Sequence, residues 1–265
     1  LIKAVAGGGG KGMRRVDDPK DFAAALGSAR SEAQNAFGNP DVLIEKYIQR
    51  PRHIEMQVFG DGTRAVHLFE RDCSLQRRHQ KVIEEAPAPG MTPEMRAAMG
   101  QAAVRAAEAI GYSGAGTIEF IVDGSQGLSP ARFWFMEMNT RLQVEHPVSE
   151  EATGLDLVRQ MFRIADGEEL GFGDPEIHGH SIEFRINAED PGRNFMPAPG
   201  TLVTWQPPTG PGVRVDEGYH AGMTVPGAFD SLVAKVIVTG SDRANAIARS
   251  RRALREIKID GMPTV

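Results

Sequence analysis

The sequence lacks the features that would tie it to a membrane, a nucleic acid or an oxidising compartment. Its one cysteine, Cys73, permits no internal disulfide and no cysteine-based zinc site. No apolar run approaches the ~20 residues that a membrane-spanning helix needs. The formal net charge of -5 disfavours a nucleic-acid surface. We therefore expect a soluble protein of a reducing compartment, with neither nucleic acid nor membrane among its partners.

The length and the two ends predict a piece of a longer polypeptide. The chain opens without methionine inside a predicted strand, 1–5, and it ends at Val265, just after another predicted strand. Its 265 residues could form one large domain or two small ones. Internal repeats and low-complexity tracts are absent from the sequence. Glycine and proline cluster near 170–178, so we place a domain boundary there.

Apolar periodicity and turn residues predict a mixture of helices and strands. A proline at the first position of one predicted helix, and an aspartate before another, are typical of helix starts. Helices are predicted over 18–37 (capped by Asp17 or Asp18), 92–110, 155–165 and 242–257. Strands are predicted over 1–5, 42–47, 53–60, 63–70, 181–187, 200–205, 212–216 and 231–239, with a hairpin over 112–139.

A row of polar residues ends the predicted hairpin. From 137 to 145, every second residue is polar, starting with Glu137 and Asn139, and the earlier strand carries a single acid, Glu119. Successive side chains of a strand point to opposite faces, so these groups share one face if the stretch is extended. Two carboxylates and an amide on paired strands are hard oxygen ligands for Mg²⁺. An edge strand with a solvated polar face is the alternative.

A glycine run follows the first predicted strand. Residues 7–12 read GGGGKG and match G-x-G-x-x-G, which is weak evidence alone. A Rossmann turn is disfavoured because 13–16 predicts a return strand and not a helix. A P-loop is disfavoured because no serine or threonine follows Lys11. A hairpin whose backbone amides close over phosphates fits better, with a flexible surface hairpin as the alternative.

Two blocks of sequence resemble a known family. They are 70–81, ERDCSLQRRHQK, and 135–148, FMEMNTRLQVEHPV. Both resemble biotin carboxylase, the ATP-grasp component of the biotin-dependent carboxylases, and the similarity extends over essentially the whole chain. The sequence is similar to biotin-carrying alpha subunits of acyl-CoA carboxylases of the methylcrotonoyl-, propionyl- or acetyl-CoA type. The hairpin loop 123–132 is longer than in the family, which should change surface shape and not chemistry.

The resemblance implies an α+β fold in two parts. Residues 1–172 would form the ATP-grasp domain, with a lid over about 1–50 and a central antiparallel sheet over about 51–172. Residues 173–265 would form a truncated biotin carboxylase C-terminal domain of α/β type. The N-terminal lobe that completes the cleft in this family is absent from the chain, as are a Met-Lys-Met biotinylation segment and a carboxyltransferase region.

The resemblance also implies which residues bind ATP. A lysine in the first strand and the glycine run would contact phosphates, the segment 45–48 would receive adenine, and two histidines and a glutamine would lie at the ribose and phosphates. The expected residues are Lys3, Gly8, Gly9, Gly10, Met13, Glu45, Lys46, Ile48, His53, Gln76 and His79. Without the resemblance, 45–48 could be a strand end with exposed charges, and a lone histidine is more often structural.

A second expected site binds bicarbonate. The basic stretch 71–81 could be a nucleic-acid patch, but it lacks interleaved aromatic residues and the whole chain is acidic. Arginine suits an anion site because its planar fork grips a carboxylate-like anion with two hydrogen bonds. The resemblance assigns bicarbonate to Lys81, Arg141, Gln143, the amide of Val144, and Glu145, and the metal to Glu119, Glu137 and Asn139.

The expected catalytic residues are Glu145, Arg185, Arg141 and Lys81. Glu145 matches the family base that deprotonates bicarbonate, which is a poor nucleophile until it loses its proton. Arg185 matches the arginine that stabilises the biotin enolate; taken alone, it could equally form a structural ion pair. Asp230 matches a position near Arg185 or a subunit interface, and we expect a supporting role for it.

The implied reaction is ATP-dependent carboxylation of biotin by bicarbonate through carboxyphosphate, the first half-reaction of an acyl-CoA carboxylase. The implied cofactors are ATP, Mg²⁺ or Mn²⁺, and biotin on a separate carrier domain. The implied partners are that carrier domain, a carboxyltransferase (beta) subunit and further copies in an oligomer, in the bacterial cytoplasm or the mitochondrial matrix. Two alternatives are another ATP-grasp carboxylate–amine ligase and a nucleotide-binding fragment that is inactive alone.

Overall fold

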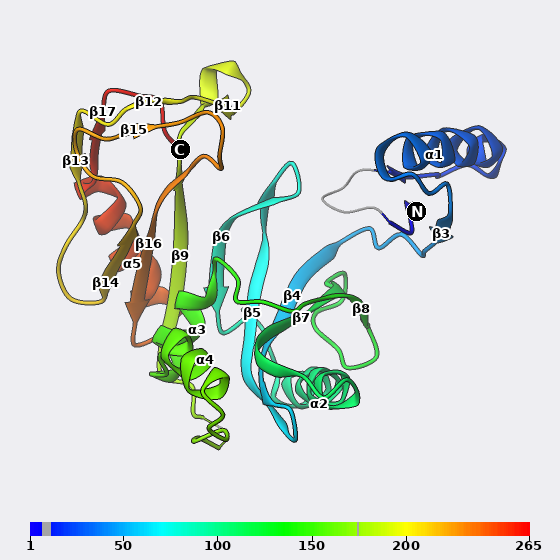
Figure 1. Ribbon diagram of the computed structural model, residues 1–265, viewed down its shortest axis with the longest axis horizontal. Coiled ribbons are helices and arrows are strands. Elements are labelled where there is room, and N and C mark those ends of the chain that lie inside the picture. The colour runs from blue at the N-terminus through cyan, green and yellow to red at the C-terminus, as the bar shows by residue number, and fades with distance from the viewer. Residues whose placement is uncertain (7–11, 174) are drawn as a thin grey trace.

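The computed structural model describes residues 1–6, 12–173 and 175–265. A large antiparallel sheet runs through most of it (Figure 1). Its strands are β4 (Pro51–Asp61), β5 (Ala65–Arg77), β6 (Gln80–Ala86), β7 (Ser113–Asp123), β8 (Phe133–Asn139), β9 (His180–Asn187), β14 (Val213–Glu217) and β16 (Leu232–Gly240). They lie in the order β14-β16-β9-β6-β5-β4-β7-β8. Because β6 pairs with β9, one sheet joins the residues before 170–178 to those after.

A small sheet with one helix precedes the large sheet. Its elements are β1 (Ile2–Ala4), β2 (Met13–Arg14), β3 (Val42–Ile44), a 3-10 turn η1 (Pro19–Asp21) and α1 (Phe22–Phe37). The predicted return strand is confirmed, because Lys3 on β1 pairs with Met13 on β2. Figure 1 shows this N-terminal unit to one side of the large sheet, joined to it by the segment that leads into β4. The predicted phosphate contacts at Gly8, Gly9 and Gly10 lie outside the described residues.

Helix α2 (Pro93–Ala109) covers one face of the large sheet and confirms the helix predicted over 92–110. Its start follows from the sequence, because the Thr92 side chain accepts a hydrogen bond from the backbone N–H of Met95 and a proline takes the first position. Met99 packs with residues of β4 and β7 in an apolar cluster. Gly100 permits the close approach, since a Cβ atom there would lie 2.5 Å from the His67 ring.

The opposite face of the sheet carries α3 (His146–Thr153) and α4 (Leu157–Ala165). Leu157 of α4 packs against Phe59 of β4 and its apolar neighbours. Helix α3 reaches the polar side chains of the sheet, because its Ser149 hydroxyl accepts a hydrogen bond from Arg71. The predicted helix over 155–165 is confirmed as α4, whereas α3 was not predicted.

Helix α5 (Arg243–Glu256) packs on β16 and β9 and confirms the helix predicted over 242–257. Asp242 caps it by accepting a hydrogen bond from the Asn245 N–H. The rest of the C-terminal region is built from short elements. These are β10 (Glu189–Asp190), η2 (Pro191–Arg193), β11 (Met196–Pro197), β12 (Gly200–Thr201), β13 (Thr204–Gln206), β15 (Thr224–Val225) and β17 (Lys258–Asp260).

The structure corrects three expectations about the strands. The polar row was expected to continue as a strand from Glu137 to Glu145, but β8 ends at Asn139 and a loop follows. The chain turns there because it crosses back over the sheet to begin α3. Strand β6 was not predicted, and the strand predicted over 200–205 is two short strands that pair with different partners.

Across the described residues, the model contains no helix of the length and apolar character required to span a membrane.

Candidate functional site

A row of charged residues crosses the middle of the large sheet. Glu55 on β4 is the direct partner of Arg71 on β5 and of Glu119 on β7. Glu119 is in turn the direct partner of Glu137 on β8. Side chains that are direct partners lie on the same face, so strand register alone brings four charged groups from four strands together on the face that carries α3.

Lys81 on β6 lies at the centre of the carboxylates. Its Nζ is 2.6 Å from Glu55 Oε2 and from Glu145 Oε1, and 3.2 Å from Glu119 Oε1. Burial would lower the pKa of Lys81, but the carboxylates, Glu55 foremost, raise it above its usual value. Lys81 is therefore held as a cation among three anions. This confirms none of its predicted roles, but it puts Lys81 and Glu145 in direct contact.

Arg71 fixes the frame around Lys81 and is completely buried. Its Nε donates to Glu55 Oε1 at 2.6 Å. Its other nitrogens donate to side-chain oxygens of four further residues of the site. These acceptors are Gln57, Thr117, Gln143 and Ser149. The five acceptors lie on four elements other than β5, so Arg71 ties β4, β5, β7, the loop after β8 and α3 into one geometry.

Glu145 connects Lys81 to Arg185. Glu145 ends the loop after β8, is 2% exposed, and accepts from Lys81 with one oxygen and from Arg185 Nη2 with the other, at 2.9 Å. Arg185 on β9 also donates through Nε to Glu84 Oε1 on β6, at 2.7 Å. The residue predicted to act on bicarbonate therefore touches the residue predicted to act on biotin.

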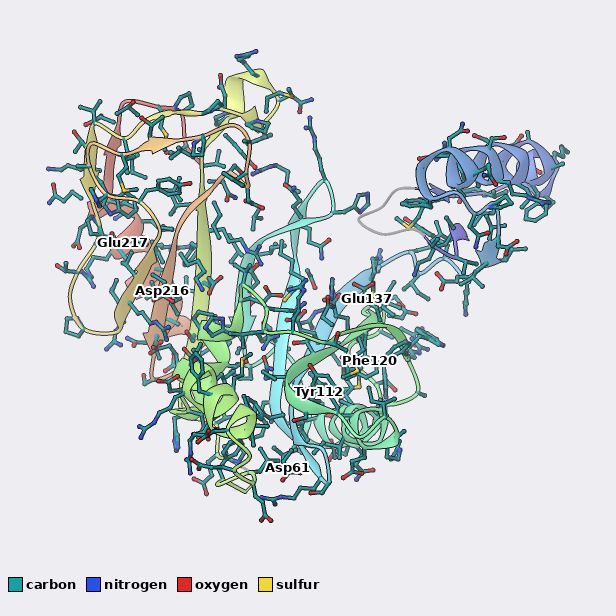
Figure 2. All side chains as sticks on the ribbon, viewed as in Figure 1. Asp61, Tyr112, Phe120, Glu137, Asp216 and Glu217 are labelled. Carbon is teal, nitrogen blue, oxygen red and sulfur yellow. The ribbon has the colours of Figure 1, made fainter. Side chains whose placement is uncertain are left out.

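Glu119 contacts one of the other residues predicted to bind metal, Asn139, together with Gln143 and His53, which were predicted for bicarbonate and for ATP. Asn139 and Gln143 each donate from their side-chain amide to Glu119 Oε1 at 2.8 Å, and His53 Nε2 lies 2.7 Å from Glu119 Oε2. Glu137 is exposed, and its carboxylate has no hydrogen bond or ion pair with any described residue. Figure 2 shows it toward the end of the sheet that faces the N-terminal unit, far from Asp61 at the opposite end.

Two buried carboxyl groups of the cluster, Glu55 and Glu119, have pKa values that their partners lower. Burial would raise the pKa of Glu55, but Arg71 and Lys81 lower it to about 2. Burial would likewise raise the pKa of Glu119, but the hydrogen bond from His53 and the charge of Lys81 lower it to about 2. Both groups are therefore anions at neutral pH.

Two groups of side chains could each place three ligand atoms around a cation. They are His53, Glu55 and Glu119, and Glu55, Cys73 and Glu145, as judged over the described residues. The Lys81 ammonium lies against both groups, because it contacts Glu55, Glu119 and Glu145, so its position favours neither of them. Glu137 belongs to neither group, and its proximity to Glu119 comes from strand register alone.

The residues predicted to bind ATP lie in two separate parts of the structure. Lys3 Nζ is 4.0 Å from the Glu45 carboxylate within the N-terminal unit. On the large sheet, Gln76 Nε2 lies 2.8 Å from His53 Nδ1. The structure thus places Lys3 beside Glu45 in one part and Gln76 beside His53 in the other. Met13 lies on β2 and Ile48 is buried, whereas Lys46 and His79 are exposed.

The residues predicted to bind bicarbonate also fall into two sets, one inside the charged cluster and one outside it. Lys81, Gln143 and Glu145 belong to the charged cluster, whereas Arg141 is exposed and donates to Asn139 Oδ1 at 3.2 Å. The carbonyl of Val144 accepts from Lys235 Nζ at 2.9 Å. A pocket of about 420 Å³ opens beside them. Its lining includes Arg77, Lys81, Val144, Arg185, Phe229 and Asp230.

Sequence reasoning missed several residues of the site. Glu55, Gln57 and Arg71 were not predicted to be site residues, and neither were Glu84 and Thr117. The alternation of Glu55 and Gln57 with apolar residues on β4 is a signal that could have found two of them, because polar residues inside an otherwise buried strand need partners. Glu84 carries no such signal, since it lies in a strand that was not predicted.

The comparisons with known proteins agree with this geometry. The family model described as "Carbamoyl-phosphate synthase L chain, ATP binding domain" matches residues 1–172. The model described as "Biotin carboxylase C-terminal domain" matches residues 183–265. The first match and the fold define an ATP-grasp protein.

Individual relatives narrow the class. The chain is 54% identical to biotin carboxylase of Nostoc sp. over 100% of its own length and 59% of the relative's. It is 52% identical to the mitochondrial methylcrotonoyl-CoA carboxylase subunit alpha of Rattus norvegicus, over 100% of this chain and 37% of that one. The chain belongs to the biotin carboxylase family. It spans well under two thirds of the length of these curated relatives.

A solved structure gives the same fold. The biotin carboxylase domain dimer of Hydrogenobacter thermophilus 2-oxoglutarate carboxylase matches with a TM-score of 0.91 and 46% identity, over 100% of this chain and 58% of that one. That structure is described as a complex with MgADP, ADP and bicarbonate. The expected α+β ATP-grasp fold with a C-terminal biotin carboxylase domain is thereby confirmed.

Proposed function

We propose that the full-length protein carrying this chain carboxylates biotin with bicarbonate and ATP, through carboxyphosphate. The observation that carries the proposal is the contact of Glu145 with both Lys81 and Arg185. A carboxylate between two cations is suited to a reaction in which one anion loses a proton and a second anion develops nearby. The family of the chain supports the same reaction.

The residues then take the following roles. Lys81, Arg141 and the amide of Val144 hold bicarbonate, and Gln143 orients the neighbouring carboxylates. Glu145 removes the bicarbonate proton, so that the oxygen can attack the γ-phosphate of ATP, which forms carboxyphosphate and releases ADP. Carboxyphosphate breaks down to CO₂ and phosphate, and the phosphate takes the N1 proton of biotin. The biotin nitrogen attacks CO₂ while the positive charge of Arg185 stabilises the negative charge on the ureido oxygen.

Glu119, Glu137 and Asn139 fit Mg²⁺ or Mn²⁺, because their side-chain oxygens are hard ligands on paired strands. Bound there, the ion would neutralise charge on the ATP phosphates. His53 and Gln76 would orient the ribose and phosphates with His79 nearby. From the N-terminal unit, Lys3 would contact phosphates. The remaining nucleotide contacts would come from Gly8, Gly9, Gly10, Met13, Glu45, Lys46 and Ile48.

We further propose that 1–172 is the ATP-grasp domain, with its lid over about 1–50, and that 173–265 is a C-terminal domain. The extents of the two family matches support this division. The proposed partners are a biotin carrier domain, a carboxyltransferase subunit and further copies of the chain. The proposed compartment is the bacterial cytoplasm or the mitochondrial matrix.

Two measurements test the function. In the full-length parent, we expect ATP hydrolysis that depends on bicarbonate and is stimulated by free biotin; a carboxylate–amine ligase would show neither. By calorimetric titration, we expect Glu119→Gln and Glu137→Gln to weaken MgATP binding. Glu94→Gln, an exposed change on α2, is the matched control and should not weaken it. Unchanged affinity in both site variants would overturn the metal assignment.

A further inference from the structure

Two buried carboxyl groups lie behind Arg185. Glu84 on β6 and Glu183 on β9 are direct partners across the two strands, and both are 0% exposed. Directly opposite residues of an antiparallel pair have Cβ atoms about 4.5–5.5 Å apart. Strand register therefore holds two carboxyl groups side by side in the interior, next to a residue that the proposed reaction uses.

The surroundings give this pair one cation at hydrogen-bond distance. Arg185 Nε donates to Glu84 Oε1 at 2.7 Å. Among the described residues, Glu84 Oε2 and both carboxyl oxygens of Glu183 have no hydrogen-bond partner. Lys235, on the neighbouring strand β16, is engaged elsewhere, because its Nζ donates to the Val144 carbonyl and lies 3.6 Å from the Asp216 carboxylate.

The rest of the environment is apolar or of the same sign. Ile237 on β16 is the direct partner of Glu183. It belongs to an apolar cluster of two sheet residues and two residues of α3, namely Ala86, Val148, Ala152 and Ile237. The charged groups that act on the pair from the packed elements are Arg185, Lys235, Glu145 and, for Glu84, Glu55. Two adjacent negative charges in such a setting are strongly unfavourable.

The electrostatics agree with the geometry. Burial raises the pKa of Glu84 to about 7, although the charge of Arg185 opposes the increase. Burial and the neighbouring Glu84 raise the pKa of Glu183 well above its usual range. Because Glu84 receives the hydrogen bond from Arg185 and Glu183 receives none, the negative charge of the pair belongs on Glu84.

We propose that Glu84 and Glu183 share one proton, held mainly on Glu183, and that the pair positions Arg185 for the reaction with biotin. The inference deepens the proposed function and rests on it. With one negative charge in the pair, Glu84 Oε1 holds both Nε and Nη2 of Arg185, at 2.7 and 2.6 Å, while Nη2 still reaches Glu145 at 2.9 Å, on the side of the pocket. A second charge, on Glu183, would draw the guanidinium toward the pair and away from biotin.

The first test uses activity in the full-length parent. Glu183→Gln imitates the protonated acid and should retain most of the biotin carboxylation. Glu183→Ala should reduce carboxylation by about 10- to 100-fold, the range found when a side chain that supports the ligands of a metal site is lost. Bicarbonate-dependent ATP hydrolysis should fall less, so more ATP is consumed per biotin carboxylated.

The pH profile separates positioning from a merely structural role. In the wild-type parent, the ATP consumed per biotin carboxylated should rise as alkaline pH ionises Glu183. The same ratio should stay flat in Glu183→Gln, because its amide cannot ionise. If Glu183→Gln loses as much carboxylation as Glu183→Ala, or keeps the wild-type rise, the proposal is wrong.

A second test does not depend on turnover. Infrared spectroscopy of the full-length parent at neutral pH should show the C=O stretch of a protonated carboxylic acid, and Glu183→Gln should remove it. Glu70→Gln is the control, since the Glu70 carboxylate is equally buried but accepts two hydrogen bonds from Arg96. Absence of the band in an active wild-type enzyme overturns the shared proton. Its presence in a parent without biotin-stimulated ATP hydrolysis overturns only the proposed function.

Discussion

The two faces of β4 are equally buried but are built in opposite ways. Ile54 and Met56 lie in the apolar cluster under α2, whereas Glu55 and Gln57 lie on the face that carries α3, and all four are 0% exposed. The face under α2 is closed by side-chain packing. The other face is closed by hydrogen bonds and ion pairs that converge on Arg71.

This difference separates the part of the sheet that stabilises the fold from the part that does chemistry. Desolvating several charges costs free energy that their mutual attraction does not always return, and an apolar core of similar volume is often as stable. Charges retained in the interior at such a cost are expected where function requires them. Variants that change one face at a time test whether the two faces differ in this way.

The largest effect is expected from Glu145→Ala on the charged face. Loss of a general base typically costs ~10²–10⁴ in rate. Without a base no carboxyphosphate forms, so bicarbonate-dependent ATP hydrolysis and biotin carboxylation should both be lost in the full-length parent. Met99→Ala, on the side of α2 that faces the sheet, should leave the specific activity of the folded protein near its wild-type value. Substantial ATP hydrolysis in Glu145→Ala would refute the role of the base.

The next largest effect is on the free energy of unfolding, for which we compare Arg71→Met on the charged face with Met99→Ala on α2. Breaking a buried ion pair from one side costs about 3–5 kcal/mol, and truncating a buried methionine costs about 2–5 kcal/mol. Adding Glu55→Gln should recover part of the loss in Arg71→Met, since it removes the carboxylate left without its partner, but should not improve Met99→Ala. Urea unfolding measures all four variants. Additive losses in both pairs would mean that Arg71 and Glu55 are not coupled.

The same contrast explains what could be predicted from the sequence. Alternation on β7 and β8 is a local property, so the partnership of Glu119 with Glu137 could be predicted from residue spacing. The polar alternation continues to Glu145, but there it does not indicate a strand. Glu145 is buried because the loop after β8 folds back over the sheet to Lys81 and Arg185, which are distant in sequence.

Other features of the charged face could not be predicted because they depend on tertiary contacts. Arg71 has the sequence signature of a surface cation, yet its acceptors come from four other elements. Helix α3 is only eight residues long, and the proline at its start resembles a helix breaker as much as a first helical residue. By contrast, α2 is long, periodic and capped, and it could be predicted almost to the residue. The individual roles at the site stay predictions.

Within the charged face, Arg185→Ala should separate the biotin step from the bicarbonate step. Removing the cation that stabilises a developing oxyanion costs about 10²–10³ in rate. Biotin carboxylation should therefore fall, while some bicarbonate-dependent ATP hydrolysis survives, and the ATP consumed per biotin carboxylated should rise sharply. Arg249→Ala, a change outside the charged cluster that removes a hydrogen bond to the Thr239 carbonyl, is the control. If both rates fall together at the wild-type ratio, Arg185 positions the fold or the nucleotide instead.

The smallest effect is expected from acid acting on two carboxylates of the charged face, Glu55 and Glu119. The pKa values of Glu55 and Glu119 are lowered from 4.5 to about 2, so the folded chain binds fewer protons than the unfolded chain between these values. The stability that each group contributes is complete above about pH 4.5 and is lost as the pH falls toward 2, with an upper limit of about 3 kcal/mol per group.

Free energies of unfolding from urea titrations between about pH 6 and pH 3 should decrease steeply in the wild-type chain. Glu119→Gln should flatten the decrease because its amide does not titrate, whereas Met99→Ala should lower the whole curve and keep its slope. Equal slopes in Glu119→Gln and the wild type would show that Glu119 titrates normally, and that its ion pairs do not stabilise the fold.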